Sequence, residues 1–409
     1  MRILYLTHRI PFPPNKGDKI RSFNILKFLS LGNEVHLGAL IDDRSDKKYV
    51  PNLLSLAESV TYDIINPFIK KAVSAFLLLN KSTISVGYFY SKRLQRSIDS
   101  LMEKIQFDVV LCSSSPMAEY IFKSKSIINN QQKKLLRVMD LIDVDSKKWL
   151  SYSEHNVGFK RWIYIREAQR LSAYEKRVAE EFDHVLLVSE NEKKQFSKMV
   201  STNNVTAVCN GVDLNYFSPD FKGILNKNGP IITFTGIMDY WPNIEGVKWF
   251  VSKVFPRIRA AIPNSIFYIV GNKPSAEVIK LALFDGIRVT GYVKDIRDYL
   301  AVADVCVAPL RIAQGIQNKV LEALSMGKAV VCTSQALEGL NAIPVEEIFV
   351  ENDEHGFADA VITLIKNKDV RDRLGKRARC RVESSYSWNK NLSILNDILV
   401  VNKKKQVFK

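Results

Sequence analysis

The chain has 409 residues, of which 46% are hydrophobic and 25% are charged, so it has the composition of a soluble globular protein with enough core for two domains. Its formal net charge of +16 favours nucleic acid, an anionic membrane face or phosphorylated substrates as partners. Nucleic acid is the weakest of these, because no RRM, KH, zinc-finger or helix-turn-helix signature is present. We therefore expect no nucleic-acid partner.

The sequence also gives no sign of a membrane span, a secretion signal or a metal site. No apolar run approaches the ~18 residues of a spanning helix. The chain begins directly with a strand-like run at 2–7, so we expect no signal peptide. The five cysteines form no C-x-x-C pair and the five histidines show no metal-ligand spacing. These features predict a cytoplasmic protein with reduced thiols and no metal or other cofactor.

Short apolar runs alternate with helical periodicity along the whole chain. In the first half we expect strands at 3–6, 35–40, 109–112, 135–139 and 185–188, with helices such as 21–31 and 94–105 between them. In the second half we expect strands at 231–235, 266–270, 287–290, 305–308 and 329–331, with helices such as 246–261 and 275–284. This alternation predicts α/β architecture with two doubly wound, Rossmann-like domains, each with a parallel sheet covered by helices.

A polar stretch with two glycines at 222–230 follows two turn-like segments and is the best linker in the chain. We place an N-terminal, acceptor-side domain at 1–215 and a C-terminal, donor-binding domain at 216–387. A final helix at about 388–409 is expected to pack back on the first domain. Ligands of doubly wound folds bind outside the carboxyl ends of the strands, so two such domains facing one another would form a cleft.

The segment 309–322 is the most informative for function. An apolar strand leads into a loop that contains Arg311 and Gly315, and the helix that follows carries Lys319 and Glu322. Backbone N–H groups and the dipole at a helix N-terminus attract anions. Arg311 offers a planar fork and Lys319 a point charge, while Glu322 can accept hydrogen bonds from sugar hydroxyls. Phosphate plus hydroxyls suggests a nucleotide sugar; the alternative is an ordinary turn with solvated charges.

Further candidates follow strands of the first half. Asp140, Asp143 and Asp145 come after the run at 135–139 and favour a site for acceptor hydroxyls, although one of them could instead cap the next helix. His8 follows the first strand, where it is either an acceptor-side residue or a satisfied loop histidine. Gly17 either lets the backbone approach the phosphates or forms a plain turn after two prolines.

Several motifs resemble family 4 glycosyltransferases of the GT-B fold, and their order and spacing match over nearly the whole chain. The motifs are the hinge-like 210–213 with 217–219, the first-strand loop 234–243, the stretch 289–293 with Asp304, and the loop 311–322. The segments 11–26 and 139–146 resemble the subgroup of sugar transferases associated with exopolysaccharide synthesis.

The resemblance implies a retaining, metal-independent transferase that moves a sugar from a nucleotide-sugar donor to a saccharide or lipid-linked saccharide. It makes Arg311, Lys319, Asp140 and Asp143 the candidate catalytic residues. It adds Gly236, Gln314 and Asn318 to Gly17, Gly315 and Glu322 as donor-binding residues, and Lys19 and Arg21 to His8 on the acceptor side. Two positions depart from the family pattern. Gln314 replaces the first glutamate of the usual Glu-x7-Glu pair, and Ile237-Met238-Asp239 replaces the usual Arg and Lys after the glycine.

These departures keep two alternatives open: a non-catalytic nucleotide-sugar-binding subunit and a nucleotide-sugar epimerase of the same fold.

We also expect the protein to bind the inner face of the cytoplasmic membrane peripherally. Lys70 and Lys71 lie beside the apolar run 72–79, and Lys403–Lys405 lie in the tail. Such a combination of basic and apolar residues is what interfacial binding requires, although core packing also explains the first segment.

Overall fold

A computed structural model describes residues 1–66, 82–129, 132, 135–154, 156–227, 229–313 and 315–407, with side chains up to residue 400. Contacts divide the chain into two units, one formed by Met1–Cys209 with Leu392–Lys409 and the other by Asn210–Asn391. Each unit is built on its own parallel sheet, as the alternation of apolar runs predicts. The fold-class prediction is confirmed.

The first unit has a seven-stranded sheet in the order β3-β2-β1-β4-β5-β6-β7. The strands are β1 Arg2–Thr7, β2 Glu34–Ile41, β3 Ser59–Ile64, β4 Val109–Ser113, β5 Leu136–Ile142, β6 His184–Leu187 and β7 Val205–Ala207. The helices of this unit are α1 Gly17–Leu29, α2 Val50–Leu53, α4 Ile84–Phe89, α5 Lys92–Lys104, α6 Ala118–Phe122, α7 Lys125–Ile128, α8 Asp145–Glu154, α9 Gly158–Glu181 and α10 Glu190–Ser197. The last helix, α19 Trp388–Val407, joins this unit from Leu392 onward.

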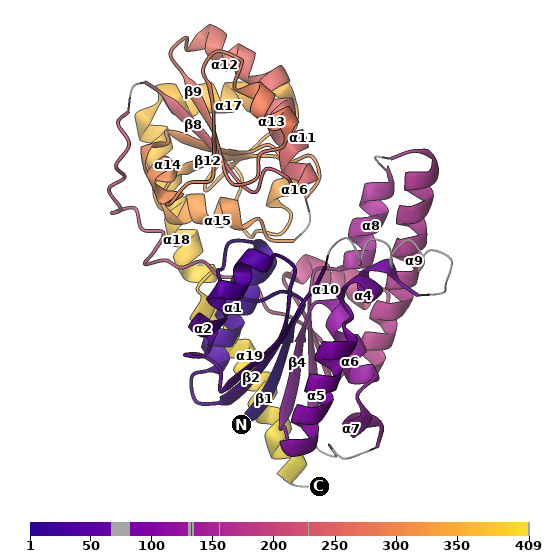
Figure 1. Cartoon of the computed structure of the whole chain (residues 1–409). Coiled ribbons are helices and arrows are strands. Elements are labelled where there is room, and N and C mark those ends of the chain that lie inside the picture. The colour runs from indigo at the N-terminus through magenta and orange to yellow at the C-terminus, as the bar shows by residue number, and fades with distance from the viewer. Residues whose placement is uncertain are drawn as a thin grey trace. The chain divides into compact units, whose positions relative to one another are not determined.

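Both faces of this sheet are covered (Figure 1). Leu4 and Leu6 of β1 point into a buried cluster that includes Leu94 and Ile98 of α5. On the opposite face, Tyr5 donates a hydrogen bond of 3.4 Å to the carbonyl of Ser22 in α1. A strand that is buried on both faces reads as a continuous apolar run, which explains why β1 is visible in the sequence.

The second unit has a six-stranded sheet in the order β10-β9-β8-β11-β12-β13. The strands are β8 Ile231–Thr235, β9 Ile266–Val270, β10 Ile287–Gly291, β11 Val305–Ala308, β12 Ala329–Cys332 and β13 Phe349–Val350. The helices are α11 Trp241–Trp249, α12 Phe255–Ala261, α13 Ala276–Leu281, α14 Arg297–Val302, α15 Asn318–Ser325, α16 Ser334–Leu337, α17 Glu354–Lys366 and α18 Lys368–Ser385. Phe250, in the π-helical turn between α11 and α12, packs 4.5 Å from Phe267 and 5.8 Å from Phe357, measured between ring centroids.

Candidate functional site

The loop between β11 and α15 places its polar groups at the carboxyl edge of the second sheet. Gly315 is buried and has φ of 63°, a conformation that glycine adopts without steric cost. Gln317 occupies the N-cap of α15 and its side chain makes no capping hydrogen bond. An eight-residue helix therefore presents its first N–H groups without a side-chain cap, which suits an anion.

Lys319 lies 83 residues after Gly236 in the sequence, and the fold brings the two together at this edge. The Nζ of Lys319 donates a 2.5 Å hydrogen bond to Oδ1 of Asn243 and lies 4.7 Å from the ring centroid of Phe234. A Cβ on Gly236 would lie 3.4 Å from that Nζ and 2.8 Å from Nδ2 of Asn243. The absence of a side chain at Gly236 thus keeps the space beside the ammonium open.

The surroundings of Lys319 and Glu322 change how both groups titrate. Burial lowers the pKa of Lys319 to about 7, although the charge of Glu322 opposes this shift. Burial also raises the pKa of Glu322 to about 7, and here the charge of Lys319 opposes the shift. An anionic ligand beside Lys319 would favour its charged form, so the site is prepared to take up a proton when an anion binds.

The remaining predicted residues of this loop differ in how firmly the protein holds them. Arg311 follows β11 and is exposed, and no hydrogen bond or ion pair to it occurs within the described part of the chain. Asn318 begins α15 and its Oδ1 accepts a 3.3 Å hydrogen bond from Asn210. Gln314 lies outside the described residues.

Two residues at this edge were not among the sequence candidates. Asn243 holds Lys319 in place, and its own Nδ2 donates to the carbonyl of Ile237 at 2.8 Å. Lys273 is exposed in the loop after β9, which meets the loop after β8 through the 2.8 Å bond from Met238 N to Asn272 O. Residue spacing alone identifies neither Asn243 nor Lys273 as a site residue. A cation that follows a strand end, as Lys273 does, is nevertheless a usable signal.

The carboxyl edge of the first sheet carries a second polar cluster. Thr7, Ser113 and Asp140 lie side by side at the ends of β1, β4 and β5, since the register pairs Thr7 with Ser113 and Ser113 with Asp140. Among the described residues, Thr7 Oγ1, His8 Nδ1 and Asp143 Oδ1 are buried and have no hydrogen-bond partner. Unpaired buried polar atoms are rare in folded proteins and here mark groups able to meet a ligand.

His8 and Asp143 are therefore the best-supported residues of this edge. His8 lies 3.0 Å through Nε2 from Oδ2 of Asp18 and packs edge-on against Phe89. Burial raises the pKa of Asp143 to about 6, an effect that Lys148 opposes. Although burial alone would raise it, the pKa of Asp18 is held well below its usual range by His8 and Arg9. Gly17 is exposed and begins α1 in the same unit.

Three predicted site residues have another role, which corrects the prediction that they touch substrate. Arg21 and Asp140 are fully buried and form a two-pronged ion pair with N–O distances of 2.7 to 3.0 Å. Lys19 is 1% exposed and its Nζ donates to Asp46 at 3.0 Å. Because these side chains are enclosed by protein, they hold α1 against β5 and against the 3-10 turn Arg44–Tyr49 rather than contact an acceptor.

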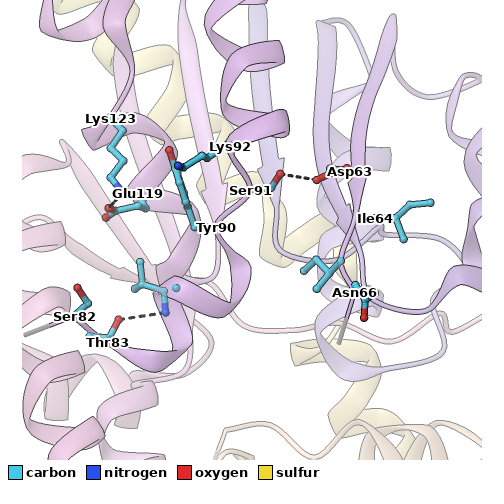
Figure 2. Close-up of a pocket in the computed structure, with 13 residues that line it drawn as sticks. Asp63, Ile64, Asn66, Ser82, Thr83, Tyr90, Ser91, Lys92, Glu119 and Lys123 are labelled. Carbon is cyan, nitrogen blue, oxygen red and sulfur yellow. Dashed lines mark hydrogen bonds and ion pairs between the residues drawn. The ribbon is translucent and has the colours of Figure 1, made fainter. Parts of the chain in front are cut away.

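A pocket of about 510 Å³ lies elsewhere in the first unit (Figure 2). Its lining combines Asp63, Tyr90, Ser91, Glu119 and Lys123. The Nζ of Lys123 lies 2.8 Å from Glu119 and 4.0 Å from the ring centroid of Tyr90, and Ser91 donates to Asp63 at 2.5 Å. None of the predicted site residues lines this pocket.

Comparison with known proteins decides the class of the second unit. Residues 229–367 match the family model described as glycosyl transferases group 1. This segment is a group 1 glycosyltransferase domain. It contains the loop of Gly315, Lys319 and Glu322, so the predicted site lies within the part of the chain that carries the family signal. The chain is a glycosyltransferase with the GT-B fold, and the prediction of the enzyme class is confirmed.

Three known proteins are similar to this chain over nearly its full length. An uncharacterized 44.6 kDa protein in the cps region of Klebsiella pneumoniae is 25% identical over 405 residues, which cover 96% of this chain and 98% of that protein. The structure of a sucrose-phosphate synthase from Thermosynechococcus elongatus superposes with a TM-score of 0.73 at 16% identity, covering 100% of this chain and 99% of the other. HepE from Anabaena, solved in complex with UDP-glucose, gives a TM-score of 0.68 at 14% identity, covering 98% and 100% of the two chains.

The described residues offer neither a cluster of metal ligands nor a membrane-spanning helix. Among the described residues, no three or more His, Cys, Asp or Glu side chains are grouped so that they could hold a metal ion. No helix within the described ranges is both long and apolar enough to span a membrane.

Proposed function

We propose that the chain transfers a sugar from a nucleotide-diphosphate sugar to a saccharide acceptor, with the diphosphate bound at the loop between β11 and α15. The observation that carries this proposal is the ammonium of Lys319, held by Asn243 beside Gly236 and directly behind the uncapped start of α15. A diphosphate placed there meets a cation and the N-terminal end of a helix together. Arg311, exposed after the same strand, supplies a second cation.

The donor that the comparisons favour carries uridine. HepE was solved with UDP-glucose, and TarM of S. aureus was solved in a complex that includes UDP. Glu322 lies one turn beyond Lys319 on α15, where its carboxylate can accept hydrogen bonds from hydroxyls of the bound donor. We therefore expect UDP-sugars to stabilise the protein more than GDP-, ADP- or CDP-sugars, which a thermal-shift screen measures directly.

The chemistry we propose proceeds with retention of configuration and without a metal ion. As the bond between the anomeric carbon and the phosphate oxygen breaks, negative charge develops on the leaving diphosphate. Lys319, Arg311 and the N–H groups of α15 stabilise that charge, so their contribution grows in the transition state. The acceptor hydroxyl attacks from the face that the diphosphate leaves, and its proton passes to the departing phosphate oxygen.

The acceptor we propose is a saccharide, free or lipid-linked, of a cell-surface polysaccharide. Its support is the relative in the cps region of Klebsiella pneumoniae and the polar cluster of the first unit. In that cluster Asp143 Oδ1 and His8 Nδ1 are, like Thr7 Oγ1, buried polar atoms with no partner among the described residues, so they can orient a hydroxyl. We propose that this work takes place on the cytoplasmic side of the membrane.

The test is an assay of transfer and of donor hydrolysis with the full-length chain. Incubation with UDP-glucose and a panel of saccharides should release UDP, and NMR of the product should show the anomeric configuration of the donor. Lys319→Gln should abolish most of the release, whereas Asp239→Ala, a matched control at an exposed position of the loop after β8, should retain it. Addition of EDTA should leave the rate unchanged.

Three results would contradict the proposal in different ways. Binding of UDP-glucose without release of UDP under any acceptor condition would indicate a non-catalytic subunit. Conversion of the free nucleotide sugar into its epimer would indicate an epimerase. A strict requirement for a divalent ion would overturn the metal-free mechanism and the roles of Arg311 and Lys319.

A further inference from the structure

The hairpin of α8 and α9 leaves the first unit as a pair of helices that lie side by side (Figure 1). It is fixed at its base, where Ser146 donates through its backbone N and its hydroxyl to the buried Glu175 at 3.1 and 2.5 Å. Above the base, Trp149, Tyr152 and Tyr164 join the two helices with ring centroids 5.4 to 6.2 Å apart. The hairpin therefore has an aromatic core of its own.

A second aromatic set lies at the start of α9, at the tip of the hairpin. Phe159 and Trp162 are 69% and 51% exposed, and their rings stack with centroids 5.5 Å apart. Val157 is 85% exposed and Leu150 of α8 is 48% exposed. Large apolar side chains that gather on one exposed surface mark an interaction site, whereas single ones do not.

Basic side chains lie among these apolar ones, and the exposed Glu154 ends α8 just before the turn. Lys160 and Arg161 are exposed and lie between Phe159 and Trp162 in the sequence. From 155 to 166 the sequence has no aspartate or glutamate. Apolar and aromatic side chains interleaved with cations are the composition that binds in the headgroup region of a bilayer, where Trp is enriched.

We propose that this tip, made of Val157, Phe159, Lys160, Arg161 and Trp162, docks on an anionic lipid bilayer. The apolar side chains enter the headgroup boundary and the two cations contact lipid phosphates. A second copy of the chain fits less well, because a two-fold interface would bring Lys160 and Arg161 of both copies against each other. The ten-residue α8 starts beside the polar cluster of Asp143, so the tip lies about 15 Å from the end of the sheet at 1.5 Å per residue.

This surface differs from the contacts that the sequence suggested. Lys70, Lys71 and the run 72–79 lie outside the described residues, as do the side chains of Lys403–Lys405. The tip of the hairpin carries both parts of an interfacial site, the cations and the exposed aromatics, within a described segment. Docking there is independent of whether the chain transfers a sugar.

The experiment is sedimentation of the full-length protein with vesicles of phosphatidylcholine alone and of phosphatidylcholine mixed with phosphatidylglycerol. Wild type should sediment only with the mixed vesicles, and less at high salt, because the screening length falls from ~10 Å at 0.1 M to ~3 Å at 1 M. The Lys160→Gln, Arg161→Gln double variant should bind about 25-fold more weakly, since one cation near an anionic surface contributes about fivefold. The Phe159→Ser, Trp162→Ser double variant should lose more than about tenfold.

Matched controls separate this surface from general charge and hydrophobicity. Lys376→Gln with Arg377→Gln removes two adjacent exposed cations from α18, and Leu283→Ser with Phe284→Ser removes two exposed apolar side chains after α13. Both control pairs should sediment like wild type. All variants change exposed positions, and circular dichroism should confirm that they fold.

Three outcomes would overturn the proposal: no binding of wild type to mixed vesicles, equal binding of the hairpin variants, or a dimer that the Phe159→Ser, Trp162→Ser variant dissociates. The last would make the tip an interface between copies. Affinity for UDP-glucose, measured without vesicles, should be the same in wild type and hairpin variants. Failure of the docking proposal is thus distinguishable from failure of the proposed transfer activity.

Discussion

The lowered pKa of Lys319 predicts that donor binding weakens as the pH rises. With a pKa of about 7, the free side chain is neutral above that pH, whereas a bound diphosphate favours the ammonium. Binding above pH 7 must therefore include the uptake of a proton. Protonating a group 1.5 pH units above its pKa costs about 2 kcal/mol, since one pKa unit corresponds to about 1.4 kcal/mol.

The measurement is isothermal titration of UDP-glucose, which carries no group that titrates near neutral pH on its diphosphate, at pH 6.5 and pH 8.5. We expect the affinity of wild type to fall by about 25-fold over this range. This factor is the ratio of the charged fractions, at the two pH values, of a group with a pKa near 7. Repeating the titration in buffers of different ionisation enthalpy should show about one proton taken up at pH 8.5.

Two variants assign the effect to its residue. Lys319→Arg keeps a charge at every pH in this range, so its affinity should depend on pH much less than that of wild type. Glu322 titrates in the same range because burial raises its pKa to about 7, and Glu322→Gln removes its part in the profile. An affinity of wild type that is equal at pH 6.5 and pH 8.5, or a slope that persists in the Lys319→Arg, Glu322→Gln double variant, would refute the placement of the diphosphate beside Lys319.

The remaining predictions concern the other charged groups. Glu322→Gln should weaken donor binding by about 1.5–3 kcal/mol, the cost of a hydrogen bond to a charged group, and donor affinity within twofold of wild type would remove this residue from the site. Asp140→Ala should lower the free energy of unfolding by about 3–5 kcal/mol in urea titrations, because Arg21 is left as an unpaired buried charge; a loss below about 1 kcal/mol would show that the pair is not the anchor of α1. Asp143 has a raised pKa of about 6, so its carboxylate is charged above that pH and the rate of transfer should decrease at lower pH. In Asp143→Asn this acidic limb should vanish from the pH profile of kcat/KM. An unchanged limb would assign the titration to another group.

The local pattern of the sequence was sufficient for the central strands. The runs at 231–235, 266–270 and 305–308 coincide with β8, β9 and β11, because central strands of a covered parallel sheet are rich in apolar and β-branched residues. β3, with the sequence Ser-Val-Thr-Tyr-Asp-Ile, was missed because it is an edge strand whose residues are all half-buried. Its identity comes from pairing with β2, a contact that no local pattern contains.

The anion-binding loop could likewise be predicted from the sequence, since a strand, a glycine, a cation and a helix start follow one another within fourteen residues at 309–322. What surrounds those residues could not be predicted. Lys319 meets Asn243 from 76 positions away and Arg21 meets Asp140 from 119 positions away, and only the tertiary fold brings each pair together. A buried charged group is neutralised by a partner of opposite charge, and desolvation shifts the pKa of a partly buried one. The sequence therefore identified the charged residues, while the fold decided which of them can contact a ligand.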